Sequence, residues 1–506
     1  MRKEVFFRPE WTCGRYVQNK HAAIYYNLIT GMCYTFEGVS ADLMGYIFNR
    51  PRNSSFDISD ITASLKLPLE DVLAFLSQLT EIGLISHSPI TKEGVARYRS
   101  CVAKERRSNH QVPTTIQDRL PFEHNNAEME FANNVGGINS VMLELTYNCS
   151  EKCVHCYNIG ATRNDEETNH RGDLPEIAIE DYRRIIDQLY DQGLFKVCLS
   201  GGDPFSKPIV WDIIQYLYDK DIAFDVYTNG QRLDGKESRL ADFYPRLVAV
   251  SIYSAIPEVH DYITRTKGSL ECSLRVMTRL GKLSVPMNLK CCIMRPNMKT
   301  YYTVIGIADA VGAVPQFEVS ITDSIDGDSC ATRYLRLKEN ELEVILRDTR
   351  VPLYVGPEVP GFGRGNRDDS ENACGAGYNS YCIRPDGKMI ACCSFHKVFG
   401  DLTVQSVEEI LSDSTSLKEW QALSVKDYDE CGTFDYCPYC NLCPGNNYSQ
   451  NGDPTKASEN NCFIARVRYG LSIKLKSGID ILDGKSVEDK IQEFEFDVTP
   501  LRRIKG

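Results

Sequence analysis

The stretch TYNCSEKCVHCYN, residues 146–158, places Cys149, Cys153 and Cys156 within eight residues. It begins at the last residue of VMLELT, residues 141–146, a short apolar segment that predicts a β-strand. A structural zinc site uses four protein ligands, commonly as two paired CxxC elements, whereas this stretch holds one such pair and a third cysteine upstream. The spacing therefore favours a metal centre that the protein leaves open at one position.

The composition predicts a soluble protein with about two to four domains. The chain has 506 residues, of which 42% are hydrophobic and 25% are charged. Its N-terminus lacks the apolar core of a secretory signal, and no window reaches the roughly 18 uninterrupted apolar residues that span a bilayer. We therefore expect a cytoplasmic protein with no membrane partner. The net charge of -12 argues against nucleic acid as a partner.

The 20 cysteines indicate metal or redox chemistry, because thiols stay reduced in the cytoplasm. Besides the first three, a second group lies towards the C-terminus. Its members are Cys374, Cys382, Cys392, Cys431, Cys437, Cys440, Cys443 and Cys462. Most of the others are scattered, and we expect each of these to be a small buried hydrophobic residue.

Strand and helix patterns alternate through the central part of the chain. VMLELT, KVCLS, FDVYT, LVAVS and MNLKCC predict strands, and a helix around Tyr182, Ile185 and Leu189 is closed by Gly193. This alternation predicts a parallel α/β barrel, or part of one, in residues 136–345. In such folds ligands bind at the carboxyl ends of the strands, where the cysteine-rich stretch lies.

Residues 1–98 predict a small α+β unit of winged-helix-like layout. Residues 22–36 predict two strands around a turn marked by Asn27 and Gly31, and two helical patterns follow, the second ending at Gly83. Such a unit is either a nucleic-acid binder or a peptide-binding module. Lys and Arg number 10 in these residues, as do Asp and Glu, so a basic face is lacking and peptide binding is favoured.

Three further segments complete the predicted organisation. Residues 99–135 are polar, lack sustained helical periodicity and predict a linker. Residues 346–475 hold the second cysteine group. Residues 476–506 form a tail that either packs across the barrel or is mobile.

The C-x3-C-x2-C spacing of Cys149, Cys153 and Cys156 after a strand resembles the signature of the radical S-adenosylmethionine (SAM) family. The resemblance implies a partial (β/α)6-type barrel and a 4Fe-4S cluster whose open iron is chelated by the amino and carboxylate groups of SAM. In that family, reductive cleavage of SAM gives a 5'-deoxyadenosyl radical that takes a hydrogen atom from the substrate.

Later segments follow in the order that the same family shows. SGGDP, residues 200–204, ends the second strand where the family carries GGE or GGD. The resemblance implies that Asp203 accepts from the methionine ammonium, that Ser251 meets the ribose, and that Lys290 meets the cofactor carboxylate. His155 is implied to lie against adenine. The implied cofactor contacts are His155, Gly201, Gly202, Asp203, Asn229, Ser251 and Lys290.

The C-terminal cysteines resemble the SPASM extension of this family, whose pattern begins with a cysteine, a run of residues and then G-x4-C. Cys374, Gly387 and Cys392 follow that pattern, with a hairpin predicted at the turn Pro385–Gly387. Eight cysteines suffice for two fully ligated auxiliary 4Fe-4S clusters, which leaves Cys393 over.

The second part of the pattern departs from the family. The usual spacing is C-x2-C-x5-C-x3-C, whereas this chain has C-x5-C-x2-C-x2-C from Cys431 to Cys443. Which thiolate serves which cluster is therefore open. A zinc site that includes Cys437 and Cys440, and a single auxiliary cluster with an open iron, are the alternatives.

Most of residues 20–90 resemble the PqqD-like recognition element, in which the leader of a ribosomally made precursor peptide adds a strand to the hairpin edge. The three modules together imply a radical SAM peptide maturase, an oxidoreductase that modifies the core peptide and takes electrons from a reductant such as flavodoxin or ferredoxin. An oxidative crosslink, thioether or carbon-carbon, is the favoured product. The alternatives are a sulfatase-maturase-like enzyme, backbone excision or epimerisation, a nucleic-acid-modifying enzyme, and a zinc-binding peptide scaffold without enzyme activity.

Overall fold

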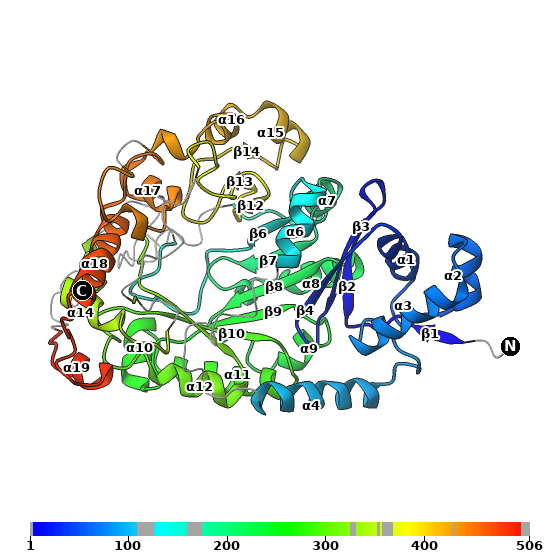
Figure 1. Cartoon of the computed structure of the whole chain (residues 1–506), viewed down its shortest axis with the longest axis horizontal. Helices are drawn as coiled ribbons and strands as arrows, with labels where there is room; N and C mark the ends of the chain where they lie inside the picture. Colours follow the sequence, from blue (N-terminus) through cyan, green and yellow to red (C-terminus); the bar gives the residue numbers. More distant parts are fainter. Residues whose placement is uncertain are drawn as a thin grey trace.

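A sheet of nine strands forms the centre of the protein in the computed structural model (Figure 1). The structure describes residues 4–108, 126–158, 175–323, 330–351, 355–356, 368–428 and 431–496. Six consecutive strands of the sheet run parallel, as the alternating pattern predicts. They are β6 (Ser140–Glu144), β7 (Lys196–Ser200), β8 (Ala223–Thr228), β9 (Leu247–Ser251), β10 (Met287–Cys292) and β11 (Val314–Glu318).

The first five of these strands were predicted, whereas β11 was not. Pro315 removes one backbone donor and Gln316 interrupts the apolar run, so the segment lacks the composition of a buried strand. β11 is the last strand on that side of the sheet and pairs with β10 alone. An edge strand tolerates a proline, because the N–H groups along its outer edge need no strand partner.

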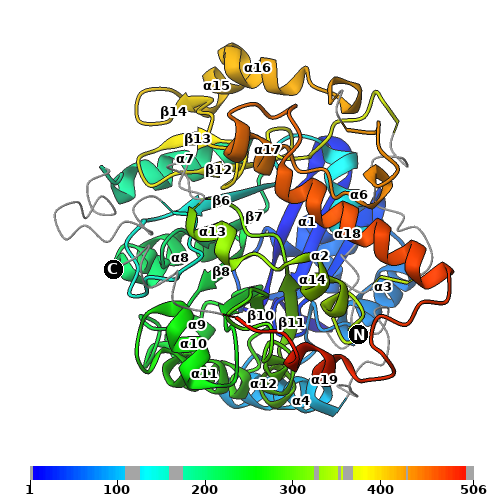
Figure 2. The same ribbon diagram turned by 90° about the vertical axis from the view of Figure 1, so that its left-hand side faces the viewer.

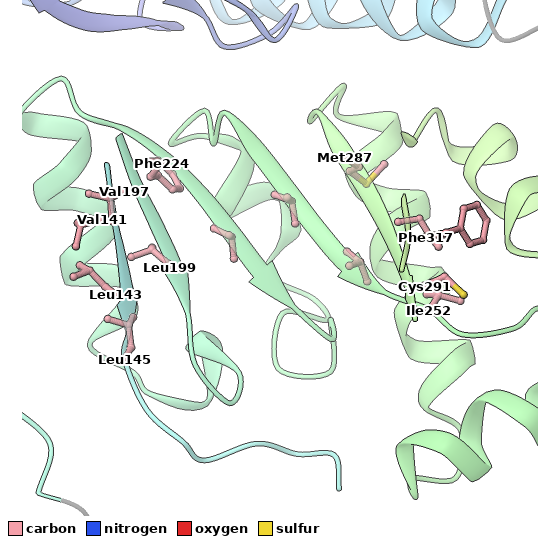
Figure 3. Packing of buried hydrophobic residues seen from close by; sticks show 14 of the residues in the cluster. Val141, Leu143, Leu145, Val197, Leu199, Phe224, Ile252, Met287, Cys291 and Phe317 are labelled. Atoms are coloured by element: carbon pink, nitrogen blue, oxygen red, sulfur yellow. The ribbon is translucent and has the colours of Figure 1, made fainter. Parts of the chain in front are cut away.

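One face of the parallel sheet packs against helices (Figure 3). Val141, Leu143, Val197 and Leu199 are at most 2% exposed and alternate along their strands with residues that face the other side. The covering helices are α7 (Ile179–Asp191), α8 (Val210–Asp219), α9 (Glu237–Ala241), α11 (Ser269–Lys282) and α12 (Thr303–Val311), and α10 (Pro257–Thr264) packs against α11. The helix predicted around Tyr182 is α7, and Gly193 follows it with φ +117°.

The N-terminal unit contains a second sheet, of three antiparallel strands. β3 (Ala22–Asn27) and β4 (Met32–Glu37) form the predicted hairpin, with Gly31 at φ +81°, and β2 (Thr12–Val17) pairs with the other edge of β3. The remaining elements of the unit are α1 (Val39–Phe48), α2 (Ile58–Leu65), α3 (Leu69–Glu81) and a two-stranded pair of β1 (Val5–Phe7) with β5 (Ser55–Asp57). The two predicted helices correspond to α2 and α3, while β2 and α1 were not predicted.

The segment 99–135 is largely helical where the structure describes it, in contrast to the expected linker. α4 (Lys92–Ser108) lies against α11 and α12, and α6 (Asn126–Val135) packs on β3 and β4. Glu128 of α6 accepts a hydrogen bond from Tyr26 Oη at 3.0 Å and forms ion pairs with Lys196 and Arg246. These contacts fasten the N-terminal sheet to the amino ends of the barrel strands, a long-range effect that helical periodicity does not report.

The C-terminal domain continues the central sheet. β12 (Ser380–Ile383) pairs parallel with β6, and β13 (Lys388–Ile390) and β14 (Gly400–Asp401) follow in antiparallel order. Gly387, at φ +78°, closes the predicted hairpin. The helices of this domain are α15 (Val407–Asp413), α16 (Thr415–Gln421), α17 (Pro444–Asn451) and α18 (Glu459–Lys476).

The tail packs against the barrel as far as the structure describes it. α18 and α19 (Val487–Gln492) both contact α14 (Glu339–Ile345), and Ile491 is fully buried (Figure 2). Among the described helices, none has the length and apolar character needed to cross a membrane.

We expect Glu128→Ala to loosen the attachment of the N-terminal sheet, because it leaves the partly buried Lys196 without its partner and Arg246 with one carboxylate instead of two. Breaking such a pair costs about 3 kcal/mol, which corresponds to roughly 100-fold faster exchange of the α6 amides if the helix opens locally. Hydrogen-deuterium exchange of the full chain measures this effect. Glu130→Ala, an exposed glutamate on the same helix, is the matched control, and equal exchange rates in the two variants would contradict the assignment.

Candidate functional site

The cysteine-rich loop that follows β6 is held by the loop that follows β7. Gly202 N donates to Thr146 O at 2.6 Å, and Asp203 N donates to Asn148 O at 3.0 Å. A Cβ atom on Gly201 would lie 2.3 Å from Thr146 O, and one on Gly202 would lie 2.4 Å from Asn148 O. Since real Cβ atoms do not approach oxygen so closely, both positions require glycine while the two loops stay in this contact.

The three thiols of this loop lie within electrostatic reach of one another. Burial is the main reason that the pKa of Cys149 is raised to about 12. Burial also raises the pKa of Cys153 well above its usual range, and repulsion from Glu151, Cys156 and Cys149 adds to that effect. Cys149 Sγ accepts from Asn229 Nδ2 at 3.2 Å. The TNG segment after β8 is thereby connected to the first cysteine.

The arrangement of these thiols is more open than a single-ion site. Zinc holds each thiolate sulfur about 2.3 Å from one centre. Within the described ranges, no three His, Cys, Asp or Glu side chains converge in a way that could hold one metal ion, and the described cysteines are not joined in disulfides. Three neighbouring thiols that do not meet at a single ion fit a larger body, such as an iron-sulfur cluster.

Asp203 ties the ends of two strands together. Its carboxylate accepts from Phe205 N at 2.9 Å and from Thr228 Oγ1 at 3.1 and 3.2 Å, and the residue is fully buried. Burial raises the pKa of this carboxyl to about 6. Asp203, which the resemblance implies to accept from the cofactor ammonium, thus already accepts hydrogen bonds from residues at the ends of β7 and β8.

Aromatic residues line the other side of the cysteine loop. His155 meets the edge of Tyr253 with ring centroids 4.9 Å apart, and Tyr253 stacks on the buried His260 at 5.5 Å. Ser251, at the end of β9, hydrogen-bonds the side chain of Tyr253. His155 and Ser251 are therefore brought together through Tyr253. Lys290 pairs with Ser251 in the β9–β10 register, but its ammonium points over Tyr227, 5.1 Å from the ring centroid.

The C-terminal cysteines separate into two groups and one outlier. The first group contains Cys431, Cys437, Cys440 and Cys462. The pKa of Cys440 is raised to about 12 by burial and then by repulsion from the other three thiols. These four thiols come from the η6 turn (Cys437–Tyr439), its flanking loops and α18.

The second group contains Cys374, Cys392 and Cys443. Burial, then Cys393, Cys443 and Cys374, raise the pKa of the Cys392 thiol. Cys382 is the outlier, because after burial the strongest effects on its pKa come from Glu144 and Cys393. It faces the interior of the barrel, next to the cysteine that the sequence pattern leaves over.

A cavity of about 560 Å³ occupies the concave side of the sheet. The N-terminal hairpin contributes its wall through Tyr26 and the turn residues Gly31–Cys33, and the C-terminal domain contributes Cys382, Cys392 and Cys393. The barrel strands supply Met142, Cys198, Asp225, Tyr227, Asn288, Lys290 and Gln316. All three parts of the chain thus enclose one space.

Two buried acids near the cysteine loop were not predicted. Glu144, 1% exposed, accepts from Tyr147 Oη at 3.0 Å, and burial raises its pKa to about 7. Glu151, 2% exposed, lies beside Cys153, and burial raises its pKa to about 8. Their position inside ELTYNCSEKC is the signal that could have identified them, because acids in a buried stretch need a function or a partner.

Comparison with known proteins places both cysteine groups in described domains. Residues 143–300 match the Radical SAM superfamily, and residues 374–444 match SPASM, described as an iron-sulfur cluster-binding domain. These ranges contain the three cysteines of the first loop and seven of the eight C-terminal cysteines, all except Cys462.

Individual proteins are similar over a larger part of the chain. The antilisterial bacteriocin subtilosin biosynthesis protein AlbA of Bacillus subtilis is 27% identical to this chain. The aligned region covers 60% of this chain and 65% of AlbA. An AdoMet-dependent heme synthase of Methanosarcina barkeri is 24% identical over 61% of this chain and 92% of its own length.

The fold is shared with a solved structure. The crystal structure of Streptococcus suis SuiB bound to precursor peptide SuiA superimposes with a TM-score of 0.54 and 13% identity, covering 90% of this chain and 99% of SuiB. The chain thus carries a region that matches the Radical SAM superfamily, followed by a region that matches the SPASM iron-sulfur cluster-binding domain.

Proposed function

We propose that this protein is a radical SAM peptide maturase that binds the leader of a ribosomally synthesised precursor through residues 1–98 and modifies its core peptide. The observation that carries the proposal is the cavity that the N-terminal hairpin, the barrel strands and the SPASM thiols enclose together. AlbA, named for bacteriocin biosynthesis, and SuiB, solved with its precursor peptide, support a peptide as the substrate.

The outer edge of β4 is suited to binding an extended leader. β4 is the last strand of the sheet, and in the described part of the chain β3 is its single strand partner. Phe36 of β4 meets the edge of Phe75 of α3, with centroids 6.0 Å apart, beside that edge. An added strand would gain main-chain hydrogen bonds from β4 and side-chain contacts from the two rings.

The residues of the first site fit the cofactors that the family uses. We assign Cys149, Cys153 and Cys156 to a SAM-binding 4Fe-4S cluster. We assign six of the seven implied cofactor contacts to SAM, namely His155, Gly201, Gly202, Asp203, Asn229 and Ser251, and leave out Lys290 because its ammonium points over Tyr227. When bound, SAM and this cluster supply a 5'-deoxyadenosyl radical for hydrogen abstraction. The protein's own contribution is to clamp the cysteine loop through Gly202 and Asn229 and to keep Ser251 and His155 on one wall.

For the SPASM domain we propose two auxiliary 4Fe-4S clusters, which makes three in all. Cys431, Cys437, Cys440 and Cys462 supply four thiolates for a closed cluster. Cys374, Cys392 and Cys443 hold the second, with Cys382 as the fourth ligand or an iron left open towards the cavity. Such clusters accept electrons, which suits an oxidative thioether or carbon-carbon crosslink with a flavodoxin or ferredoxin as reductant.

The protein, purified anaerobically and reconstituted with iron and sulfide, is expected to cleave SAM reductively when dithionite is supplied. Chromatography that detects 5'-deoxyadenosine measures the reaction, and Cys153→Ala, which removes one cluster thiolate, is expected to abolish it. A protein that binds zinc in place of iron and forms no 5'-deoxyadenosine would overturn the proposal and favour a non-enzymatic scaffold.

Gly202→Ala is expected to prevent assembly of the first cluster, because its Cβ would meet Asn148 O at 2.4 Å and displace the cysteine loop. Iron analysis should show a loss of about four iron atoms per chain, the content of one cluster. Gly306→Ala in α12 is the matched control, since no atom lies within 4 Å of its added Cβ. Full iron content in Gly202→Ala would mean that the contact between the two loops is dispensable.

Phe36→Ala is expected to weaken leader binding about tenfold, the usual cost of truncating a central aromatic contact. Fluorescence anisotropy of a labelled leader peptide from the precursor encoded beside the gene measures the affinity. Val39→Ala, an exposed residue at the start of α1, serves as the control. If residues 1–98 can be deleted without slowing modification of the precursor, a sulfatase-maturase-like mode of substrate binding is favoured instead.

A further inference from the structure

The charged side chains that line the central cavity are paired, with one exception. Lys196 forms an ion pair with Glu128, and Arg246 Nε donates to Asp225 Oδ1 at 2.8 Å while a second nitrogen of the same guanidinium pairs with the other oxygen. Among the described residues, Lys290 has neither an ion pair within 4.0 Å nor a hydrogen bond from its ammonium. Its ammonium lies over the ring of Tyr227 instead, 5.1 Å from the ring centroid.

The ammonium of Lys290 points away from the cysteine loop. In the strand register Lys290 is level with Ser251, whereas Tyr227 is level with Ala249, one step nearer the amino ends of the strands. Asp225 and Cys198 lie a further step in that direction, and both interact electrostatically with Lys290. The side chain therefore bends towards the middle of the cavity.

Two amide side chains neighbour Lys290 on the sheet and line the same cavity. Gln316 is the register partner of Lys290 on β11, and Asn288 precedes Lys290 by two residues on β10, so all three face the cavity. Gln316 Oε1 is buried and lacks a hydrogen-bond partner in the described structure. Because the oxygen and nitrogen of an amide exchange places by a simple flip, Gln316 offers either a donor or an acceptor to a ligand.

A desolvated ammonium without an anion is costly, and a bound carboxylate removes that cost. Burial lowers the pKa of Lys290, in agreement with an ammonium that lacks sufficient compensation. Asp225 does not provide it, since both of its oxygens are taken by Arg246. Glu318 accepts instead from the backbone N–H groups of Val319 and Ser320 at 2.8 Å.

We propose that Lys290, Gln316 and Asn288 form a binding site for the carboxylate side chain of an aspartate or glutamate in the core peptide. The inference rests on the proposed function and names the substrate class that the cavity selects. Lys290 supplies the charge, while the two amides direct hydrogen bonds to the carboxylate oxygens. The acidic residue would anchor the core peptide inside the barrel, in the cavity that Cys382, Cys392 and Cys393 also line.

The test uses two probes of equal size, N-acetyl-aspartate amide and N-acetyl-asparagine amide, titrated against the full-length reconstituted protein by ligand-observed NMR. We expect the aspartate probe to bind about tenfold more tightly, the usual gain from a hydrogen bond to a charged group. Lys290→Met should abolish the preference and Lys290→Arg should retain most of it. Lys397→Met, which removes a lysine paired with Glu419 at the surface, should keep the full preference.

Equal affinity of the wild-type protein for both probes would overturn the inference. A preference that survives in Lys290→Met, with normal circular dichroism and iron content, would also overturn it. So would a Lys290→Met variant that binds SAM tenfold more weakly but keeps the preference, because that result would assign Lys290 to the cofactor. If Lys290→Met does not fold, a smaller preference in Gln316→Leu supports the site and an unchanged one overturns it. Peptide-free SAM cleavage by the wild type tests the proposed function separately, so either idea can fail alone.

Discussion

The close contact between the backbone after β6 and the backbone after β7 is the constraint on which the rest of the site depends. Gly201 and Gly202 bring their chain within hydrogen-bonding distance of Thr146 and Asn148, at a separation that excludes a Cβ atom. This contact fixes the start of the cysteine loop. Asp203 extends the connection to β8 through Thr228, so the ends of three strands hold the loop in place.

The second organising feature is the way in which three modules share one cavity. The N-terminal hairpin contributes part of the cavity wall, and the ion pairs of Glu128 with Lys196 and Arg246 hold the hairpin there. β12 pairs with β6, so the SPASM thiols reach the cavity from the opposite wall. A peptide held at β4 would therefore enter a space that its own recognition unit helps to form.

The predictability of the fold follows from the range of the interactions that stabilise each element. The strands β6 to β10 and α7 were predicted because each buries a continuous or periodic apolar set, which local sequence displays. β11 was missed because Pro315 and Gln316 mask it. The helix α6 was missed because it is polar: its position depends on Tyr26, Lys196 and Arg246, which are distant in the chain.

The sequence by itself predicted the first metal centre, because the three cysteines lie in one short loop and their spacing limits which metal group they can hold. It also predicted the hairpin at Gly387, whereas the need for glycine in SGGDP follows from the contact of Gly201 and Gly202 with the backbone after β6. The tertiary structure alone decided how the eight later cysteines divide, that Asp203 is engaged by Thr228, and that Lys290 turns into the cavity without an anion. The physical reason is that burial and electrostatic compensation depend on neighbours contributed by other strands and domains, and spacing along the chain carries no information about them.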